Sequence, residues 1–398
     1  MKKTVALAVA ALLTLGVNAQ TAKKDSTEGF KFTVVKENPI TSIKNQNRSG
    51  TCWAYSSLGF FEAELLRMGK GEIPLCEMYL AHKTYEDRAV AAVRMHGDIS
   101  FSQGGSFYDA VYCMKNYGMV PRDAMPAAGT LYGDTLANFN EFFPVLEAQV
   151  GVFTKGNMKK LSPVWNQSIN STIDTYLGKC PTEFTYKGKK YTPQSFMKMT
   201  GLNLDDYVSL TSFTHHPFYD KFIIEVQDNW RWGTSYNLPL DEFMEVMESA
   251  VKNGYTFAWG ADVTENGFDR NGIAVCPDLK KAKDENGSDF AHWFGKTPQT
   301  NRAAYTARPL PELDVTQEMR QEAYDNWETT DDHGMVIYGM AKDQNGKEYF
   351  MVKNSWGTDH QYGGVWYASK AFVAYKTMNI LINKNAIPKA IAKKLGLK

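Results

Sequence analysis

The sequence has no excess of charge of either sign, since its 398 residues include 44 Lys and Arg and 44 Asp and Glu. A protein that mainly binds nucleic acid usually carries a strongly basic face, so nucleic acid is not expected as a partner. Long hydrophobic runs are also lacking. The apolar run from 5 to 17 is shorter than the ~20 residues of a transmembrane helix, and no membrane anchor is expected.

Cysteine is scarce, and its spacing lacks the patterns of metal and redox sites. The five cysteines form no C-x-x-C pair and have no metal-ligand spacing with the seven histidines, so no metal or cofactor is predicted. A thiol redox enzyme is disfavoured because the nearest cysteine to Cys52 is 24 residues away. An odd count leaves at least one thiol outside any intramolecular disulfide, and Cys52 is the candidate. The sequence does not decide whether any others pair, but they are expected to be small buried hydrophobic residues: Cys76, Cys113, Cys180 and Cys276.

The adjacent histidines His215 and His216 are the one hint of a metal site. They are followed by Pro217 and have no acidic or Cys partner at ligand spacing along the chain. A structural role is therefore predicted for them.

The amino-terminal residues have the features of an export signal. Two lysines precede the apolar run from 5 to 17, and V-N-A before Gln20 offers a small-residue cleavage site. We expect residues 1–19 to be a signal peptide and the remaining chain to be exported, to the periplasm or outside the cell.

A buried helix is predicted to begin at Cys52. Apolar residues recur after it at steps of three and four, and glycines mark its end: Leu58, Phe61, Leu65, Met68, Gly69 and Gly71.

A thiol at a helix N-terminus has an environment that favours a nucleophile. The free N–H groups and the positive end of the helix dipole stabilise a thiolate, and the same N–H groups can hold an oxyanion. Gln46, six residues before Cys52, supplies an amide donor that could complete such an oxyanion hole.

A β-hairpin is predicted in the last quarter of the chain. Residues 335–341 and 349–353 read as strands, and the Asp-Gln-Asn-Gly stretch at 343–346 reads as the turn between them. Residues 365–368 are predicted to add another strand.

This hairpin brings a histidine and an asparagine together. His333 lies at the start of the first strand and Asn354 comes after the second, so the amide could orient the imidazole while Trp356 covers their hydrogen bond. With Cys52, they form a candidate Cys-His-Asn set for acyl transfer.

The paired glycines Gly104 and Gly105 precede a second helical pattern. Glycine lets another backbone approach closely, so an extended peptide substrate could lie there. A plain loop is the alternative.

Taken together and in this order, these residues resemble the papain family of cysteine peptidases, in which a Cys near the mature N-terminus precedes a distant His and Asn. The motifs that carry the resemblance are Gln46, Cys52-Trp53, Gly104-Gly105, His333-Gly334-Met335 and Asn354-Ser355-Trp356-Gly357.

Two departures from papain resemble the bleomycin hydrolase and aminopeptidase C branch. Ser49 stands where papain has an additional Cys, and the interval of 281 residues from Cys52 to His333 is longer by some 130 to 150. Further stretches are similar to that branch: Glu77-Met78-Tyr79-Leu80, His216-Pro217-Phe218-Tyr219 and Trp259-Gly260-Ala261-Asp262-Val263.

The resemblance implies an α+β fold of two papain-like lobes with a large, mostly helical insertion. The expected bounds are a helical lobe at about 40–126, the insertion at about 127–311, a β-rich lobe with the His and Asn at about 312–372, and a C-terminal helical arm at about 373–398.

The resemblance also implies roles for the matching residues. Cys52 would attack the peptide carbonyl, His333 would form an ion pair with it and protonate the leaving amine, and Asn354 would fix the imidazole. Gln46 and the Cys52 N–H would form the oxyanion hole. Gly104 and Gly105, with Trp356, are the expected substrate-binding residues.

The family resemblance implies an aminopeptidase that acts on peptides, needs no cofactor or metal, and assembles as a homohexamer. In that branch a C-terminal tail fills the cleft and its carboxylate meets the substrate ammonium. The sequence lacks the aromatic and Pro-rich tail of the branch, so an endopeptidase or dipeptidyl-type peptidase is the alternative, and after it an inactive binding protein. Asp331, two residues before His333, could replace the tail carboxylate or be an exposed acid at a strand edge.

Overall fold

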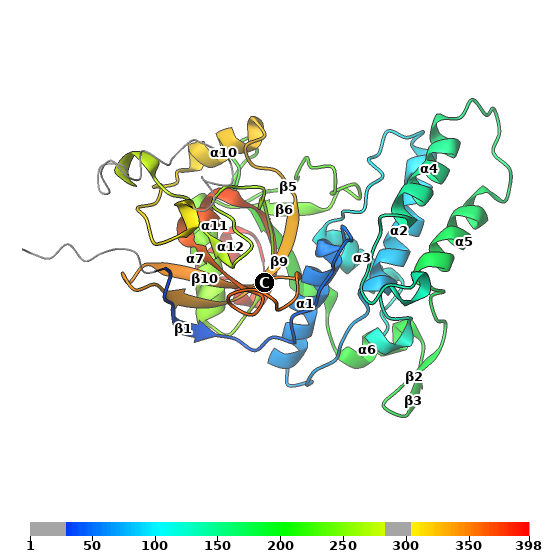
Figure 1. Ribbon diagram of the computed structural model, residues 1–398, viewed down its shortest axis with the longest axis horizontal. Helices are drawn as coiled ribbons and strands as arrows, with labels where there is room; N and C mark the ends of the chain where they lie inside the picture. Colours follow the sequence, from blue (N-terminus) through cyan, green and yellow to red (C-terminus); the bar gives the residue numbers. More distant parts are fainter. Residues whose placement is uncertain (1–28, 283–303, 398) are drawn as a thin grey trace, which may run out of the picture.

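The computed structural model describes residues 29–282 and 304–397, and the predicted signal peptide lies outside these ranges. The fold is α+β and has two parts, a group of helices and a large mixed sheet, with one helix between them (Figure 1). Among the described residues, no helix has both the length and the apolar character needed to cross a bilayer.

The helix between the two parts is α1 (Cys52–Arg67), which begins where the apolar spacing predicts. Its side chains are buried on nearly every face, because it packs against strand β9 on one side and against helices α2 and α3 on the other. Leu58, Phe60 and Phe61 have no exposed surface. A helix that is buried on nearly every face lies in the interior of a fold.

The helical part contains α2, α4 and α5 packed side by side, with a small two-stranded sheet beyond them (Figure 1). Its elements are α2 (Glu77–Arg94), α3 (Phe107–Asn116), α4 (Phe142–Lys155), α5 (Trp165–Leu177), α6 (Pro193–Thr200), β2 (Phe184–Tyr186) and β3 (Lys189–Tyr191), with short 3-10 turns at Arg122–Ala124 and Thr130–Tyr132.

The main sheet has the strand order β5-β6-β4-β12-β7-β9-β10-β11-β8, and β1 pairs with β9 outside this path. The strands are β1 (Thr33–Glu37), β4 (Tyr207–Thr211), β5 (Lys221–Ile223), β6 (Thr234–Asn237), β7 (Phe257–Ala261), β8 (Ile273–Ala274), β9 (His333–Lys342), β10 (Glu348–Lys353), β11 (Val365–Ser369) and β12 (Thr377–Asn383). The helices around it are α7 (Leu240–Lys252), α10 (Gln317–Asp325), α11 (Lys370–Lys376) and α12 (Lys389–Lys394), with 3-10 turns at Leu204–Asp206 and Lys384–Ala386.

Strands β9 and β10 form the predicted hairpin. Val352 is opposite Ile337 and Lys353 is opposite Val336, after a bulge between Met351 and Val352. The bulge sets the register of the last residues of β10, and it therefore determines how Asn354, the next residue, lies relative to the start of β9.

The expected mostly helical insertion at 127–311 differs from the structure in its second half. Residues 142–200 hold helices α4, α5 and α6 and the small β2–β3 sheet, but residues 207–274 contribute strands β4 to β8 to the main sheet. Strand β7 is buried at every position because it lies between β9 and β12, and a short apolar run of this kind does not show strand alternation in sequence.

The expected C-terminal helical arm at 373–398 is also wrong over most of its length. Residues Thr377–Asn383 form strand β12, which pairs with β4 and β7 near the middle of the sheet. Only Lys389–Lys394 are helical near the end of the chain. Pairing with these two strands, which are distant in sequence, makes this segment a strand and not a helix.

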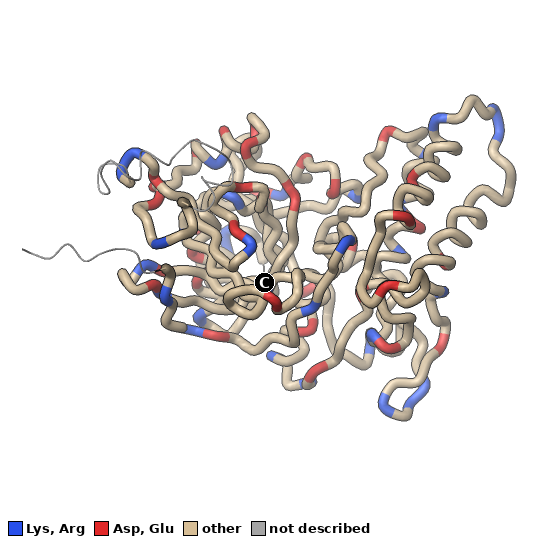
Figure 2. The backbone as a smooth tube through the Cα atoms, in the orientation of Figure 1, with Lys and Arg blue, Asp and Glu red and all other residues tan. Residues whose placement is uncertain are grey.

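Charged residues of both signs are interspersed over the described part of the chain, where Figure 2 shows no single basic or acidic stripe. Inside the structure, Lys44 lies between two buried carboxylates, at 2.7 Å from Glu62 and 2.6 Å from Glu77. Glu62 also accepts hydrogen bonds from Thr41 and from the Leu75 backbone N–H. This buried cluster holds the segment before Cys52, which carries Thr41 and Lys44, against helices α1 and α2.

Removing the cation from this cluster is expected to destabilise the protein. Lys44→Met leaves two buried carboxylates without their shared partner, so the free energy of unfolding should fall by about 3–5 kcal/mol in urea denaturation. Lys115→Met is the matched control, because its partner Asp205 and Lys115 are both exposed. A Lys44→Met protein as stable as the control would contradict the importance of the cluster.

Candidate active site

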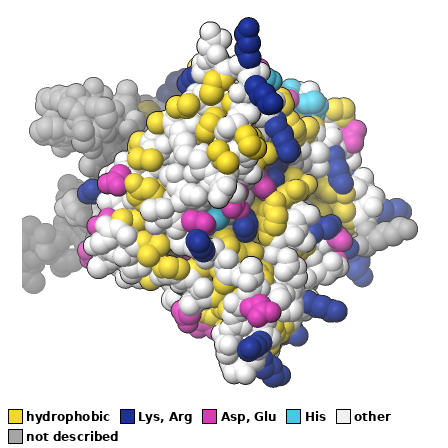
Figure 3. All heavy atoms as spheres, turned by 90° about the vertical axis from the view of Figure 1, so that its right-hand side faces the viewer, with side chains coloured by type: hydrophobic (Ala, Val, Ile, Leu, Met, Phe, Trp, Pro, Cys, Tyr) yellow, Lys and Arg dark blue, Asp and Glu magenta, His cyan; other side chains and the backbone are white. Residues whose placement is uncertain are grey.

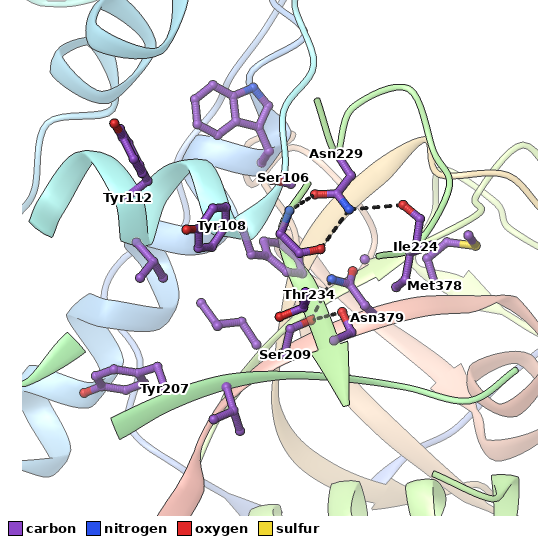
Figure 4. Close-up of a pocket in the computed structure, with 18 of the residues that line it drawn as sticks. Ser106, Tyr108, Tyr112, Tyr207, Ser209, Ile224, Asn229, Thr234, Met378 and Asn379 are labelled. Carbon is purple, nitrogen blue, oxygen red and sulfur yellow. Dashed lines mark hydrogen bonds between the residues drawn. The ribbon is translucent and has the colours of Figure 1, made fainter. Parts of the chain in front are cut away.

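Cys52 is the first residue of α1, as the sequence predicts. Its thiol is free and partly exposed, and it lines a cavity of about 700 Å³ together with His333, Asp331 and Asp228. Tyr108 and Tyr112 of α3 lie on one side of this cavity, and Ser209 and Asn379 of the sheet lie on another (Figure 4). The space-filling view shows acidic side chains next to a histidine at the edge of an apolar area on one face (Figure 3).

Strand β9 carries His333 to the Cys52 end of α1. Gly334 packs directly on α1, where a Cβ would be only 2.5 Å from the Ser56 Oγ atom. A backbone hydrogen bond from Gly334 also reaches the Cys52 sulfur and lowers its pKa. The glycine in the His-Gly pair is therefore required for the close approach of strand and helix.

Asn354 orients the imidazole of His333. Its Oδ1 lies 2.8 Å from His333 Nε2 and also accepts a bond of 2.7 Å from the Ser355 N–H. The Trp356 ring lies over the imidazole, with ring centroids 4.8 Å apart. With Nε2 bonded to Asn354, the other ring nitrogen is left to exchange a proton with the thiol.

Trp356 covers the His-Asn bond, as the hairpin interpretation predicts. Its other ring contacts are with Phe268 and Trp366, and it is absent from the described lining of the cavity. Direct contact of Trp356 with a substrate therefore stays a prediction, and the structure supports a shielding role instead.

Gln46 is buried and ties the stretch before α1 to the residues after Asn354. Its Oε1 accepts a 2.5 Å bond from Ser355 Oγ, and its Nε2 donates to the Ser49 carbonyl at 2.7 Å. An amide nitrogen has two protons, so one remains for a substrate oxygen. The oxyanion role of Gln46 stays a prediction.

Gly104 and Gly105 are needed for contacts within the protein. A Cβ on Gly104 would be 1.8 Å from Asp228 Oδ2, and a Cβ on Gly105 would be 2.9 Å from the Trp53 ring. Gly105 lines the cavity beside Trp53. Their contact with a substrate backbone remains a prediction.

The acid Asp228 lines the cavity but has no signal in the sequence. It lies in the connection between β5 and β6, and its carboxylate accepts from Ser102 Oγ at 2.9 Å and lies 3.5 Å from buried Arg88. No motif marks it, because its partners are distant in sequence.

The connection that carries Asp228, residues 224–233, is fixed at both ends. Asn229 Nδ2 donates to the carbonyls of Ile224 and Gly233, at 3.0 and 2.9 Å (Figure 4). Arg231 binds Asp109 at 2.6 Å and Asp87 at 2.5 Å in the helical part. The connection thus joins the two parts of the fold at the cavity.

Burial opposes separate charges on the catalytic pair. It raises the pKa of the Cys52 thiol to about 12, helped by the nearby carboxylates of Asp331 and Asp228, and lowers the pKa of His333 to about 4. Neither group alone is charged at neutral pH. A thiolate at neutral pH therefore needs another group to take its proton, and transfer of that proton to His333 stays a prediction.

The four other cysteines are all free. Cys76, Cys113 and Cys276 are buried, as expected for small hydrophobic residues, and Cys180 is partly exposed.

Replacing the base should show that the thiol cannot ionise alone. In His333→Gln, a Cys52 pKa of about 12 in place of about 8.5 for a free thiol cuts the thiolate fraction at pH 7 more than 1,000-fold. Peptide hydrolysis and iodoacetamide alkylation at pH 7 should both be lost, and alkylation should recover only at strongly alkaline pH. Rapid alkylation at pH 7 would contradict this pairing.

The contact between β9 and α1 can be tested by a rescue experiment. Gly334→Ala places a methyl group against Ser56 Oγ, which should displace His333 and reduce kcat by at least 10-fold. Adding Ser56→Ala removes that oxygen and should restore part of kcat. Ser56→Ala alone is the control, and full activity of Gly334→Ala would show that the contact is not critical.

Comparisons with known proteins agree with this geometry. Residues 77–292 and 295–397 match the Peptidase C1-like family, so the matched part includes His333 and Asn354 but begins after Cys52. Aminopeptidase G of Lactobacillus delbrueckii subsp. lactis is 23% identical over 89% of this chain and 83% of its own length. Aminopeptidase C of Streptococcus thermophilus is 24% identical over 86% of this chain and 80% of its own.

Among solved structures, PepW from Lactobacillus rhamnosis HN001 has the same fold. The TM-score is 0.65 at 20% identity, and the match covers 92% of this chain and 84% of that one.

Proposed function

Because the chain belongs to the Peptidase C1-like family, we propose that it is a cysteine aminopeptidase that hydrolyses peptides from the amino end. The observation that carries the proposal is Cys52 at the start of α1, in one cavity with a His333 that Asn354 orients. The names of the aminopeptidase relatives support the preference for a free amino end.

The geometry supports a two-step acyl transfer. His333 takes the Cys52 proton as the sulfur attacks the peptide carbonyl carbon, and the resulting oxyanion is held by the Cys52 N–H and Gln46. The protonated imidazole then donates to the leaving amine, the C–N bond breaks, and a thioester remains. Water, deprotonated by His333, attacks the thioester, which releases the carboxylic acid and returns the proton to the thiol.

We further propose that Asp331, with Asp228, receives the ammonium group of the substrate. Asp331 lines the cavity with Cys52, is partly buried, and has no hydrogen-bond partner among the described residues, so its carboxylate is available to a substrate cation. Burial and the negative charges of Asp228, Asp332 and Asp262 raise the pKa of Asp331 to about 7. A substrate cation would relieve this repulsion.

The neighbouring acid, Asp332, is already occupied. Its carboxylate accepts from the Val263 N–H at 2.8 Å and from the N–H and hydroxyl of Thr264. Asp331 is therefore the free acid of the adjacent pair. The cavity lining also includes Gly396 and Leu397, so the end of the described chain reaches the same space.

The test compares an aminoacyl-coumarin substrate with its N-acetylated form. The free amine should be cleaved with a kcat/KM at least 10-fold higher, and Asp331→Asn should raise KM for the free amine only. Asp205→Asn is the matched control, because that acid lines the same cavity but is paired with Lys115. Equal cleavage of both substrates would contradict recognition of the free amine. No cleavage of either substrate would contradict the proposed peptidase activity.

The pH dependence of substrate binding depends on the raised pKa of Asp331. The carboxylate is charged above about pH 7 and is protonated as the pH falls through that value, so KM for the free amine should rise below about pH 7. The acetylated substrate and the Asp331→Asn enzyme should lack this rise in KM.

Mass spectrometry of the products separates release of single residues from release of dipeptides or internal cleavage.

Export and a homohexamer are further parts of the proposal. The signal-like residues 1–19 and the family resemblance support them. Secretion of a tagged full chain and light scattering of the purified protein are the measurements that check them.

A further inference from the structure

A second cluster of chemically active side chains lies away from the catalytic pair. His215 and His216 come after strand β4, and Glu225 comes after strand β5. The Nε2 atom of His215 lies 3.3 Å from Glu225 Oε2, and that of His216 lies 3.5 Å from Glu225 Oε1. The three ligand atoms lie within 4.8 Å of one another. Glu225 is ten residues from His215, which is not a metal-ligand spacing, and it becomes a neighbour because β4 and β5 both pair with β6.

These separations suit a tetrahedral metal ion. Zinc binds imidazole nitrogen and carboxylate oxygen at about 2.0–2.2 Å, which places neighbouring ligand atoms about 3.3–3.5 Å apart. Each histidine nitrogen lies at such a distance from one oxygen of Glu225, His215 from Oε2 and His216 from Oε1. The three ligand atoms lie within 4.8 Å of one another, so a side chain at the surface has to turn for all three to bind one ion at these distances.

The two imidazoles are held in place by aromatic neighbours. His215 stacks on Tyr324 of α10, with ring centroids 5.5 Å apart, and His216 stacks on Phe222 at 4.4 Å. Rings that are already fixed lose little freedom when they bind an ion.

Outer hydrogen bonds complete the arrangement. The other ring nitrogen of His215, Nδ1, faces the side-chain amide of Gln321, at 3.1 Å from its Nε2 and 3.3 Å from its Oε1. In the tautomer whose Nδ1–H donates to Gln321 Oε1, the Nε2 atom of His215 is free to bind an ion. The hydroxyl of Tyr324 donates to the Glu225 carbonyl at 3.1 Å and to its Oε2 at 3.4 Å. Metal-binding imidazoles and carboxylates usually have such partners behind them.

We propose that His215, His216 and Glu225 form a site for a zinc-class divalent ion. Two imidazoles and one carboxylate favour zinc, nickel or copper over magnesium or calcium, which bind mainly oxygen. The cluster lies at the surface, so water can occupy the fourth position. The ion would link the β4–β5 connection to the start of the β5–β6 connection, and α10 would support the ligands through Gln321 and Tyr324. This inference does not depend on the proposed peptidase activity.

Zinc titration by calorimetry tests the site in a full-length Cys52→Ala background, since the thiol-imidazole pair is itself a zinc ligand set. One equivalent of Zn²⁺ should bind, and Mg²⁺ at the same concentration should not. His216→Ala and Glu225→Gln should each weaken zinc binding by more than 10-fold, because loss of outer-shell partners alone typically costs about 10- to 100-fold. Zn²⁺ should also raise the Tm of the Cys52→Ala protein but not that of the two variants.

His96→Asn is the matched control. His96 is exposed and has a positive φ of 55°, which Asn tolerates, so its replacement should leave zinc binding unchanged. Glu225→Gln keeps the shape and the hydrogen-bonding capacity of the side chain, so folding is preserved if His216→Ala is unstable. Zinc binding of equal strength in Glu225→Gln and the parent, or no zinc binding in the parent, would overturn the site.

Discussion

The site depends on the close packing of strand β9 against helix α1. The proposed nucleophile, Cys52, comes from the helix and the proposed base, His333, comes from the strand, so their relative position is set where the two elements touch. Gly334 allows that contact, because any side chain there would meet Ser56. The same residue sends a backbone hydrogen bond to the Cys52 sulfur. The packing of β9 on α1 and the activation of the thiol therefore both depend on the neighbouring residues His333 and Gly334.

The sheet that presents β9 is assembled from segments that are far apart along the chain. Strand β7 lies between β9 and β12, and β12 in turn pairs with β4, so residues near 210, 260 and 380 all support the strand that carries His333. The connection at 224–233 then joins this sheet to the helical part through Arg231. The segment that the resemblance treats as an insertion thus supplies both support for the base and one wall of the cavity.

Local patterns in the sequence predicted the parts of the site that are themselves local. The apolar spacing after Cys52 located α1, and the turn at 343–346 located the hairpin that joins His333 to Asn354. Strands β7 and β12 were missed because long-range pairing, and not alternation of polarity, determines them. Asp228 was missed for a related reason, because its partners Ser102 and Arg88 lie 126 and 140 residues away in the chain. Glu225 is only ten residues from His215, but the two side chains meet because β4 and β5 both pair with β6, and no spacing rule describes such an encounter.

The acids near Cys52 have two opposing effects on the chemistry. Burial is the main cause of the raised pKa of the thiol, and the charges of Asp331 and Asp228 add to it, so these charges disfavour the thiolate. Burial and the charge of Asp228 likewise raise the pKa of Asp331. A substrate ammonium between them would cancel both effects at once, because one positive charge stabilises the carboxylates and removes their repulsion from the sulfur. Recognition of the amino end would then also favour ionisation of the nucleophile, and a peptide without a free amine would lack this gain. In such a site, specificity for the amino end is built into the activation of the thiol.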